Sequence, residues 1–401
     1  MAAAHPLATE VGYRVLQEGG HAVDAAVAVQ MVLTLVEPQS SGIGGGAFLM
    51  LWDGQAVSAW DGRETAPAQA NENLFLLPNG QPMPFRQAVA GGRSVGVPGT
   101  VKLLGAAHQR HGRLPWARRL QPAIDLATQG FEVTPRMHAQ LKAESALQGT
   151  ENARRFFYQP DGQPWPVGHR LRNPALAHVL RAVAERGSEA FYTGQIAEDL
   201  VRRVRNDPRQ AGRMTLEDLR AYRVVEREPL CTPWRLWRLC GFPPPSSGHL
   251  TLMQILALGD LAGWGGLEPL AGAQPTPEFL HHYTEAARLA FADRDRYVAD
   301  PAFVSAPGQR WESLLDARYL RDRARIVGAT SMQRAEPGIP PGGPALTWGS
   351  PASQPEHGTS HLSIVDGQGR AVAMTTTIEA VWGAGILADG GSGLPGGYLL
   401  N

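Results

Sequence analysis

The peptide bond between Gly358 and Thr359 has the surroundings of a self-cleaving junction that releases a nucleophile. Residues 336–358 hold six prolines and five glycines, a composition typical of an exposed linker. A threonine hydroxyl is a weak nucleophile without a base. If Thr359 became the first residue of a chain, its own α-amine, with a pKa of about 8, would be placed to accept the hydroxyl proton. The alternative interpretation is a threonine that simply begins a β-hairpin after a loop.

A second candidate is the glycine-rich segment 42–47, which matches the pattern of a dinucleotide-binding loop. Phosphate binding by such a loop requires a strand, a turn and then a helix, so that the helix N-terminus faces the pyrophosphate. Here the helix-like apolar segment 22–36 precedes the glycines, and the short apolar run 47–52 follows them as a strand. The sequence therefore favours glycines that permit close backbone approach over a nucleotide site.

The sequence patterns for a metal site and for a serine nucleophile are weaker than the pattern around Thr359. Among twelve histidines, no pair has zinc-ligand spacing with a glutamate between them. His281 and His282 are adjacent, so on a helix they point to different faces and a solvated or capping role is favoured. The sequence contains no Gly-x-Ser-x-Gly elbow, and Ser246 and Ser247 follow three prolines as turn residues. We expect neither a metal nor a cofactor.

The elements that must position Thr359 are two predicted pairs of strands. Apolar residues alternate along 359–365, residues 366–369 form a turn, and 371–378 returns as the partner strand. This hairpin presents Thr359 at its tip. The second pair consists of the strand at 47–52 and a strand at 56–60, and Arg63 lies just beyond it.

Most of the remaining chain has helical periodicity. We predict a buried helix at 22–36, with Asp24 in its first turn, and a capping box from Thr215 to Asp218. Residues 235–242 are strand-like. Further helices are predicted from residue 98 onward and at 116–129, 174–186, 194–205, 249–261 and 276–297.

Composition excludes several classes of protein. Thirty-seven basic residues balance thirty-seven acidic ones, which argues against a nucleic-acid partner. The longest apolar stretch, 25–36, is too short to span a bilayer, and the N-terminus has no signal-peptide pattern. The two cysteines exclude a disulfide-rich scaffold. Cys231 and Cys240 flank a segment that could turn a hairpin, but two separate thiols are the favoured interpretation.

The order of these motifs closely resembles the γ-glutamyltransferase (glutathione hydrolase) family, over its large subunit and the start of its small subunit. The resemblance covers almost the whole chain. Its matching segments are 3–10 with 18–26, 37–48, 61–68, 96–100, 243–248, 290–297 and 357–377.

The resemblance implies an α+β, N-terminal-nucleophile hydrolase with a four-layer αββα sandwich. Members of this family are proenzymes that cut themselves before the nucleophilic threonine, which corresponds to the Gly358–Thr359 bond. Residues 1–358 would then be the large-subunit region of one domain, and 359–401 the start of the small-subunit region. The family also suggests a periplasmic or extracellular location.

The resemblance also implies roles for four residues. Thr359 would attack the γ-glutamyl amide of glutathione or another donor, and water or an amino-acid or peptide acceptor would take the acyl group. Thr377 matches a second threonine that supports the nucleophile and the cleavage. Arg63 matches the arginine that binds the substrate α-carboxylate. A guanidinium suits this role because it can donate two parallel hydrogen bonds to one carboxylate. Glu379 stands where the family contacts the α-amino group. The alternative for Arg63 is an ordinary surface ion pair with Glu64 or another carboxylate.

The sequence departs from the family pattern at its end. It stops at Asn401, before the aspartate, the paired serines and the paired oxyanion-hole glycines of the family. We therefore expect an incomplete second sheet and no measurable γ-glutamyl transfer by these 401 residues alone. The alternative functions are a non-catalytic truncated homologue, or a related acylase, amidohydrolase or capsule-polymer transferase with the same nucleophile.

Overall fold

The computed structural model describes residues 1–144, 146–343 and 358–401, which form two compact units. Within the described residues, the first unit holds 1–226 and 358–401, and the second holds 227–343. The predicted linker at 336–358 therefore lies largely outside the described residues, whereas both sides of the Gly358–Thr359 bond are inside them.

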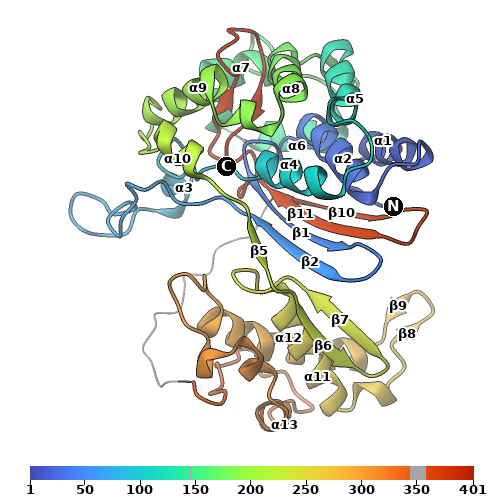
Figure 1. Cartoon of the computed structure of the whole chain (residues 1–401). Helices are drawn as coiled ribbons and strands as arrows, with labels where there is room; N and C mark the ends of the chain where they lie inside the picture. Colours follow the sequence, from blue (N-terminus) through green and yellow to red (C-terminus); the bar gives the residue numbers. More distant parts are fainter. Residues whose placement is uncertain (145, 344–357) are drawn as a thin grey trace. The chain divides into compact units, whose positions relative to one another are not determined.

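The first unit is built around a five-stranded sheet. Its strands are β1 (Gly46–Trp52), β2 (Val57–Gly62), β5 (Val225–Arg227), β10 (Thr359–Val365) and β11 (Ala371–Thr377). They lie in the order β10-β11-β1-β2-β5, and the first four are antiparallel to their neighbours (Figure 1). Both predicted strand pairs are confirmed. Their joining is a long-range feature, since β1 pairs with β11 along its whole length.

Helix α2 (Ala22–Val36) is the predicted buried helix, and all of its fifteen residues are buried. The Asp24 carboxylate accepts the His21 N–H at 2.7 Å, which caps the first turn as predicted. The helix packs on β10 and β11 and on three neighbouring helices, α1 (Pro6–Gln17), α4 (Thr100–His111) and α5 (Trp116–Gln129). Alternate residues of β10, such as Leu362 and Ile364, are buried, and the others are exposed.

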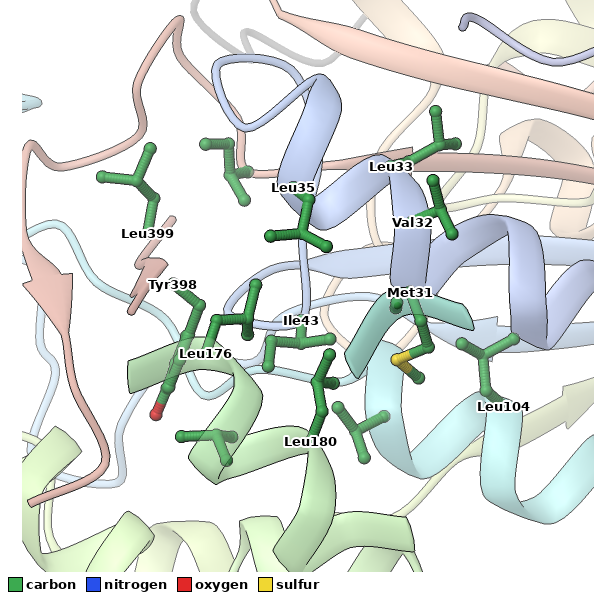
Figure 2. Packing of buried hydrophobic residues seen from close by; sticks show 14 of the residues in the cluster. Met31, Val32, Leu33, Leu35, Ile43, Leu104, Leu176, Leu180, Tyr398 and Leu399 are labelled. Carbon is green, nitrogen blue, oxygen red and sulfur yellow. The ribbon is translucent and has the colours of Figure 1, made fainter. Parts of the chain in front are cut away.

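The core extends from α2 to the far helices of this unit. Figure 2 shows Leu35 and Ile43 near Leu176 and Leu399, which come from distant parts of the chain. The other helices are α3 (Phe85–Ala88), α6 (Pro135–Ala143), α7 (Glu151–Phe157), α8 (Pro174–Arg186), α9 (Gly194–Arg205) and α10 (Leu216–Ala221). The short strands are β3 (Phe131–Glu132), β4 (Arg170–Leu171), β12 (Leu387–Ala388) and β13 (Tyr398–Leu399).

The predicted helices at 116–129, 174–186 and 194–205 are confirmed with the same bounds. The capping box at the start of α10 is also present. The Thr215 hydroxyl accepts the Asp218 N–H at 3.3 Å, and the Asp218 carboxylate accepts the Thr215 N–H at 2.7 Å.

The second unit has its own apolar core, which includes Leu258, Leu289 and Leu320. Its helices are α11 (Gly248–Leu261), α12 (Pro277–Tyr297) and α13 (Ala317–Ala324). Its strands are β6 (Leu230–Trp234), β7 (Trp237–Gly241), β8 (Leu270–Ala271) and β9 (Gln274–Pro275). Short 3-10 helices occur in both units, at 146–149, 188–191, 264–266, 307–309 and 311–315.

The expectation of two separate thiols was wrong. Cys231 and Cys240 are directly opposite in the β6–β7 hairpin and are joined by a disulfide. The cause is the register of the hairpin. Trp234 pairs with Trp237 across a two-residue turn, so Cys231 and Cys240, each three residues farther from the turn, also form a pair of opposite residues. Sequence reasoning recognised a possible hairpin between the cysteines but predicted only the second of these strands, so pairing of the cysteines across strands was ranked below two separate thiols.

Candidate functional site

Four strand ends meet at one end of the sheet in the first unit. Thr359, the first residue of β10, pairs with Thr377, the last residue of β11, and Thr377 pairs with Gly46 at the start of β1. On the other side of β1, Ala47 pairs with Gly62, the last residue of β2. Arg63 follows directly. The antiparallel order thus gathers residues that are up to 331 positions apart, as Gly46 and Thr377 are.

The hydroxyl of Thr377 lies at the centre of this cluster. It donates to the carbonyl oxygen of Gly358 at 2.9 Å, and it accepts the backbone N–H of Glu379 at 2.8 Å. The Thr359 hydroxyl donates to the Thr377 hydroxyl oxygen at 3.3 Å. The two predicted threonines are therefore brought together beside the carbonyl of the Gly358–Thr359 bond, whose glycine has a φ of +84°.

The two residues predicted to hold an amino acid are also brought together. The Arg63 guanidinium forms an ion pair with Glu379 at 2.8 Å and another with Glu64 at 3.1 Å. Sequence reasoning treated an ion pair with Glu64 or another carboxylate as the alternative to a functional role, and the structure contains two such ion pairs. Glu379 has a φ of +69°, an unfavourable backbone conformation of the kind that clusters at functional sites.

Glu64 differs from Glu379 in its environment. Its carboxyl group is packed against the backbone of Gly46, and burial raises its pKa, although the Arg63 charge opposes this shift. Burial lowers the pKa of Arg63, but the negative charge of Glu64 raises it by more. The pKa therefore lies above its usual value, and the guanidinium is always charged. The Tyr222 hydroxyl fixes this segment by donating to the Arg63 carbonyl at 2.7 Å.

A cavity of about 350 Å³ opens beside Arg63 and Glu379. That volume lies in the range of small-molecule sites. Polar groups of Glu64, Arg93, Ser94 and Asn401 line it together with apolar side chains, which include Leu74, Phe75 and Val89.

Asn401 and Glu64 are site-lining residues that sequence reasoning missed. The Asn401 side chain donates to the carbonyls of Gly44 and Gly96 at 2.9 and 3.0 Å and accepts the Gly96 N–H at 2.8 Å. These contacts join segments far apart in the chain, so no local pattern indicated them. Glu64 had one usable signal, its position next to Arg63.

The glycine-rich segment serves close backbone packing, as its position between helix and strand predicted. A Cβ on Gly45 would lie 2.0 Å from the Thr377 carbonyl oxygen, and one on Gly44 would lie 2.1 Å from that of Leu399. Gly46 begins β1. The segment thus lets β1 approach the end of β11, beside the two threonines.

Other candidate chemistries find no support in the described residues. Within 1–144, 146–343 and 358–401, no three His, Cys, Asp or Glu side chains gather as a metal site would require. His281 and His282 contact backbone carbonyls of Gly328 and Glu278. No helix in these ranges combines the length and apolar character needed to cross a membrane.

Comparison with known proteins identifies the relatives of this chain. The sequence model of the family described as Gamma-glutamyltranspeptidase matches residues 8–394. The glutathione hydrolase proenzyme of Bacillus subtilis (strain 168) is 33% identical over 96% of this chain. The alignment spans 65% of that relative's length.

Two solved structures show the same fold. Helicobacter pylori gamma-glutamyltranspeptidase superposes with a TM-score of 0.76 at 31% identity, over 84% of this chain and 95% of that one. The cephalosporin acylase from Bacillus halodurans superposes with a TM-score of 0.78 at 28% identity, over 97% and 67%. These neighbours confirm the N-terminal-nucleophile hydrolase fold class, and the chain belongs to the gamma-glutamyltranspeptidase family.

Proposed function

We propose that this protein transfers or hydrolyses γ-glutamyl groups with the hydroxyl of Thr359, after cutting itself between Gly358 and Thr359. The observation that carries the proposal is the hydroxyl of Thr377, which donates to the Gly358 carbonyl oxygen at 2.9 Å while accepting from the Thr359 hydroxyl at 3.3 Å. One group thus contacts both the nucleophile and the carbonyl that it would attack.

The cleavage begins when the Thr359 oxygen attacks the carbonyl carbon of Gly358. The negative charge that develops on the Gly358 oxygen is stabilised by the Thr377 hydroxyl. The Gly358–Thr359 C–N bond breaks, the nitrogen takes the proton that the Thr359 hydroxyl loses, and an ester joins Gly358 to the Thr359 oxygen. Water then hydrolyses the ester. The products are a Gly358 carboxylate, ending the large-subunit region 1–358, and a Thr359 with a free α-amine, beginning the small-subunit region.

The free α-amine makes the second reaction feasible. It takes the proton of the Thr359 hydroxyl as the oxygen attacks the γ-carbonyl of a donor such as glutathione. The donor amide bond breaks, its nitrogen leaves with the proton, and a γ-glutamyl ester remains on Thr359. Water completes hydrolysis, or the amine of an amino acid or peptide completes transfer.

The ion pair between Arg63 and Glu379 supports an amino acid as the acyl end of the donor. An α-amino acid carries one carboxylate and one ammonium group on a single carbon. Its carboxylate replaces Glu379 on the Arg63 guanidinium, and its ammonium group binds the Glu379 carboxylate. Each charge of the pair therefore keeps a partner when the donor binds.

The alternative is an acylase that acts on dicarboxylic monoamides, as the cephalosporin acylase neighbour suggests. Such a donor has no amino group and would leave the Glu379 carboxylate without a counter-charge. We therefore propose γ-glutamyl compounds as the preferred donors.

The test uses the protein with a complete small-subunit region, because residues 1–401 alone are not expected to turn over a donor. It is compared with its Thr359→Ala variant and a Ser363→Ala control on the same strand. We expect intact-mass analysis to find two fragments that meet at Gly358–Thr359 in the wild type and control, and one chain in Thr359→Ala. The cleaved protein should release nitroaniline from γ-glutamyl-4-nitroanilide faster than from glutaryl-4-nitroanilide. An uncut, folded wild-type chain would refute the proposal, and a preference for the glutaryl compound would favour the acylase.

A further inference from the structure

The Arg63–Glu379 ion pair, which we call the clamp, borders a cavity that contains a second arginine, Arg93. The proposed chemistry does not use Arg93. Both carboxylates that line this cavity, those of Glu64 and Glu379, form ion pairs with Arg63. The half-buried Arg93 guanidinium donates to the Leu74 carbonyl oxygen at 3.3 Å. Among the described residues, no carboxylate lies within ion-pair distance of Arg93.

The backbone around Arg93 is held in place. The Arg93 N–H donates to the Gln210 carbonyl oxygen at 3.1 Å, and the Gly91 N–H donates to that of Ala384 at 3.0 Å. The Ser94 hydroxyl donates to the Val89 carbonyl oxygen at 2.9 Å. This fixed backbone holds the base of the Arg93 side chain beside the cavity, so that only the side chain has to become ordered when an anion binds.

The surroundings of Arg93 favour a ligand that is partly apolar and ends in a carboxylate. The side chains of Leu74, Phe75 and Val89 line the same cavity. Apolar walls lower the local dielectric and strengthen the attraction between a guanidinium and a carboxylate. At about 350 Å³, the cavity is of a size at which one small ligand contacts both arginines.

We infer that Arg93 binds the carboxylate of the donor's leaving group and thereby selects γ-glutamyl compounds whose amine part is itself acidic. This inference rests on the proposed function. The inference requires that a donor held by Arg63 and Glu379 at its α-amino-acid end extends its leaving group toward Arg93, which lines the same cavity. The glycine carboxylate of glutathione, two residues beyond the scissile amide, is the group that we assign to Arg93.

Two chromogenic donors that differ by one carboxylate test this inference. γ-Glutamyl-4-nitroanilide has a neutral leaving group, and γ-glutamyl-3-carboxy-4-nitroanilide has an acidic one. We expect Arg93→Gln to raise the KM for the acidic donor about tenfold to a hundredfold, the effect of losing a charged hydrogen bond. The KM for the neutral donor should change less than twofold. Arg93→Lys should retain part of the preference for the acidic donor, because lysine keeps the positive charge but lacks the paired N–H donors of a guanidinium.

The control is Arg86→Gln, which removes an exposed arginine of α3 that does not line the cavity. It should leave both KM values unchanged. Equal KM changes for the two donors in Arg93→Gln, or no change for either, would overturn the inference.

A binding experiment separates this inference from the proposed function. If the wild-type protein turned over neither donor, the proposed function would fail. Calorimetry of the Thr359→Ala protein with glutathione and with its C-terminal amide then decides the role of Arg93. Tighter binding of glutathione that disappears on adding Arg93→Gln supports the inference, and equal binding of the two peptides refutes it.

Discussion

Replacing Thr377 by valine tests the proposed cleavage most directly, because it removes one hydroxyl and nearly preserves the shape of the side chain. In the structure that hydroxyl donates to the Gly358 carbonyl oxygen at 2.9 Å and accepts the Glu379 N–H at 2.8 Å. The first contact strengthens as negative charge develops on the oxygen. The second is present before and during the reaction.

The two contacts predict effects of different kinds. Loss of one donor to a developing oxyanion costs about 2.7–4 kcal/mol in a well-studied protease, or about 10²–10³ in rate. We therefore expect Thr377→Val to slow cleavage at least about a hundredfold. Loss of the acceptor for the Glu379 N–H should lower the free energy of unfolding by about 1–3 kcal/mol.

The assay is a time course of cleavage by intact-mass analysis, starting from freshly folded precursor. The control is Thr375→Val on the same strand, whose hydroxyl contacts His361 at 2.8 Å and not the junction. Circular dichroism confirms that both variants fold. Cleavage of Thr377→Val at the wild-type rate would show that this hydroxyl does not stabilise the transition state.

Three further predictions concern Arg63 and Gly45 at the site and Asp24 at the start of α2. Arg63→Lys should raise the KM for γ-glutamyl-4-nitroanilide about tenfold or more, because lysine keeps the charge and loses the bidentate fork. Gly45→Ala should lower the free energy of unfolding by at least about 1–3 kcal/mol, since its Cβ would lie 2.0 Å from a backbone oxygen of β11. Burial raises the pKa of Asp24, but hydrogen bonds from the His108 ring and backbone N–H groups more than offset it, so the folded-state pKa lies below 3.8. Asp24 thus stabilises the fold above pH 3.8, and this contribution is lost as the pH falls through the folded-state pKa.

Each of these three predictions has a measurement that would contradict it. An unchanged KM in Arg63→Lys would remove the carboxylate-binding role. Wild-type thermal stability of Gly45→Ala would mean that β1 moves aside at no cost. For Asp24, urea unfolding of the wild type and Asp24→Asn at pH 7 and pH 3 should give a smaller stability difference at the lower pH, and an equal difference would refute the linkage.

The local parts of the fold could be predicted from the sequence because their signals are local. The hairpin at 359–378 combines alternating apolar residues with an Asp-Gly turn, and both strands formed as predicted. Helix α2 is apolar on every face, and it is buried on every face. In these segments the residue pattern and the packing point to the same structure.

The features that the sequence missed depend on a strand that was not predicted and on partners far along the chain. The Cys231–Cys240 disulfide required the register of a hairpin of which only one strand was predicted. The contacts of Asn401 required segments about 300 and 360 positions away to be neighbours. A single sequence gives no measure of which distant segments become neighbours, so the contacts of Asn401 had no signal before the fold was known.

The same long-range pairing decides whether the candidate site exists at all. Thr377 contacts Thr359 within the hairpin, but Arg63 lies at the same end of the sheet only because β1 lies between β11 and β2. Side chains alternate along a strand, so a slip of one residue in the β1–β11 register would turn one strand's side chains to the opposite face. Close packing at Gly44 and Gly45 and the burial of α2 under β10 and β11 oppose such a slip. The glycine-rich segment and the apolar helix, which touch no substrate in the proposed mechanism, therefore determine the distance between the nucleophile and the clamp.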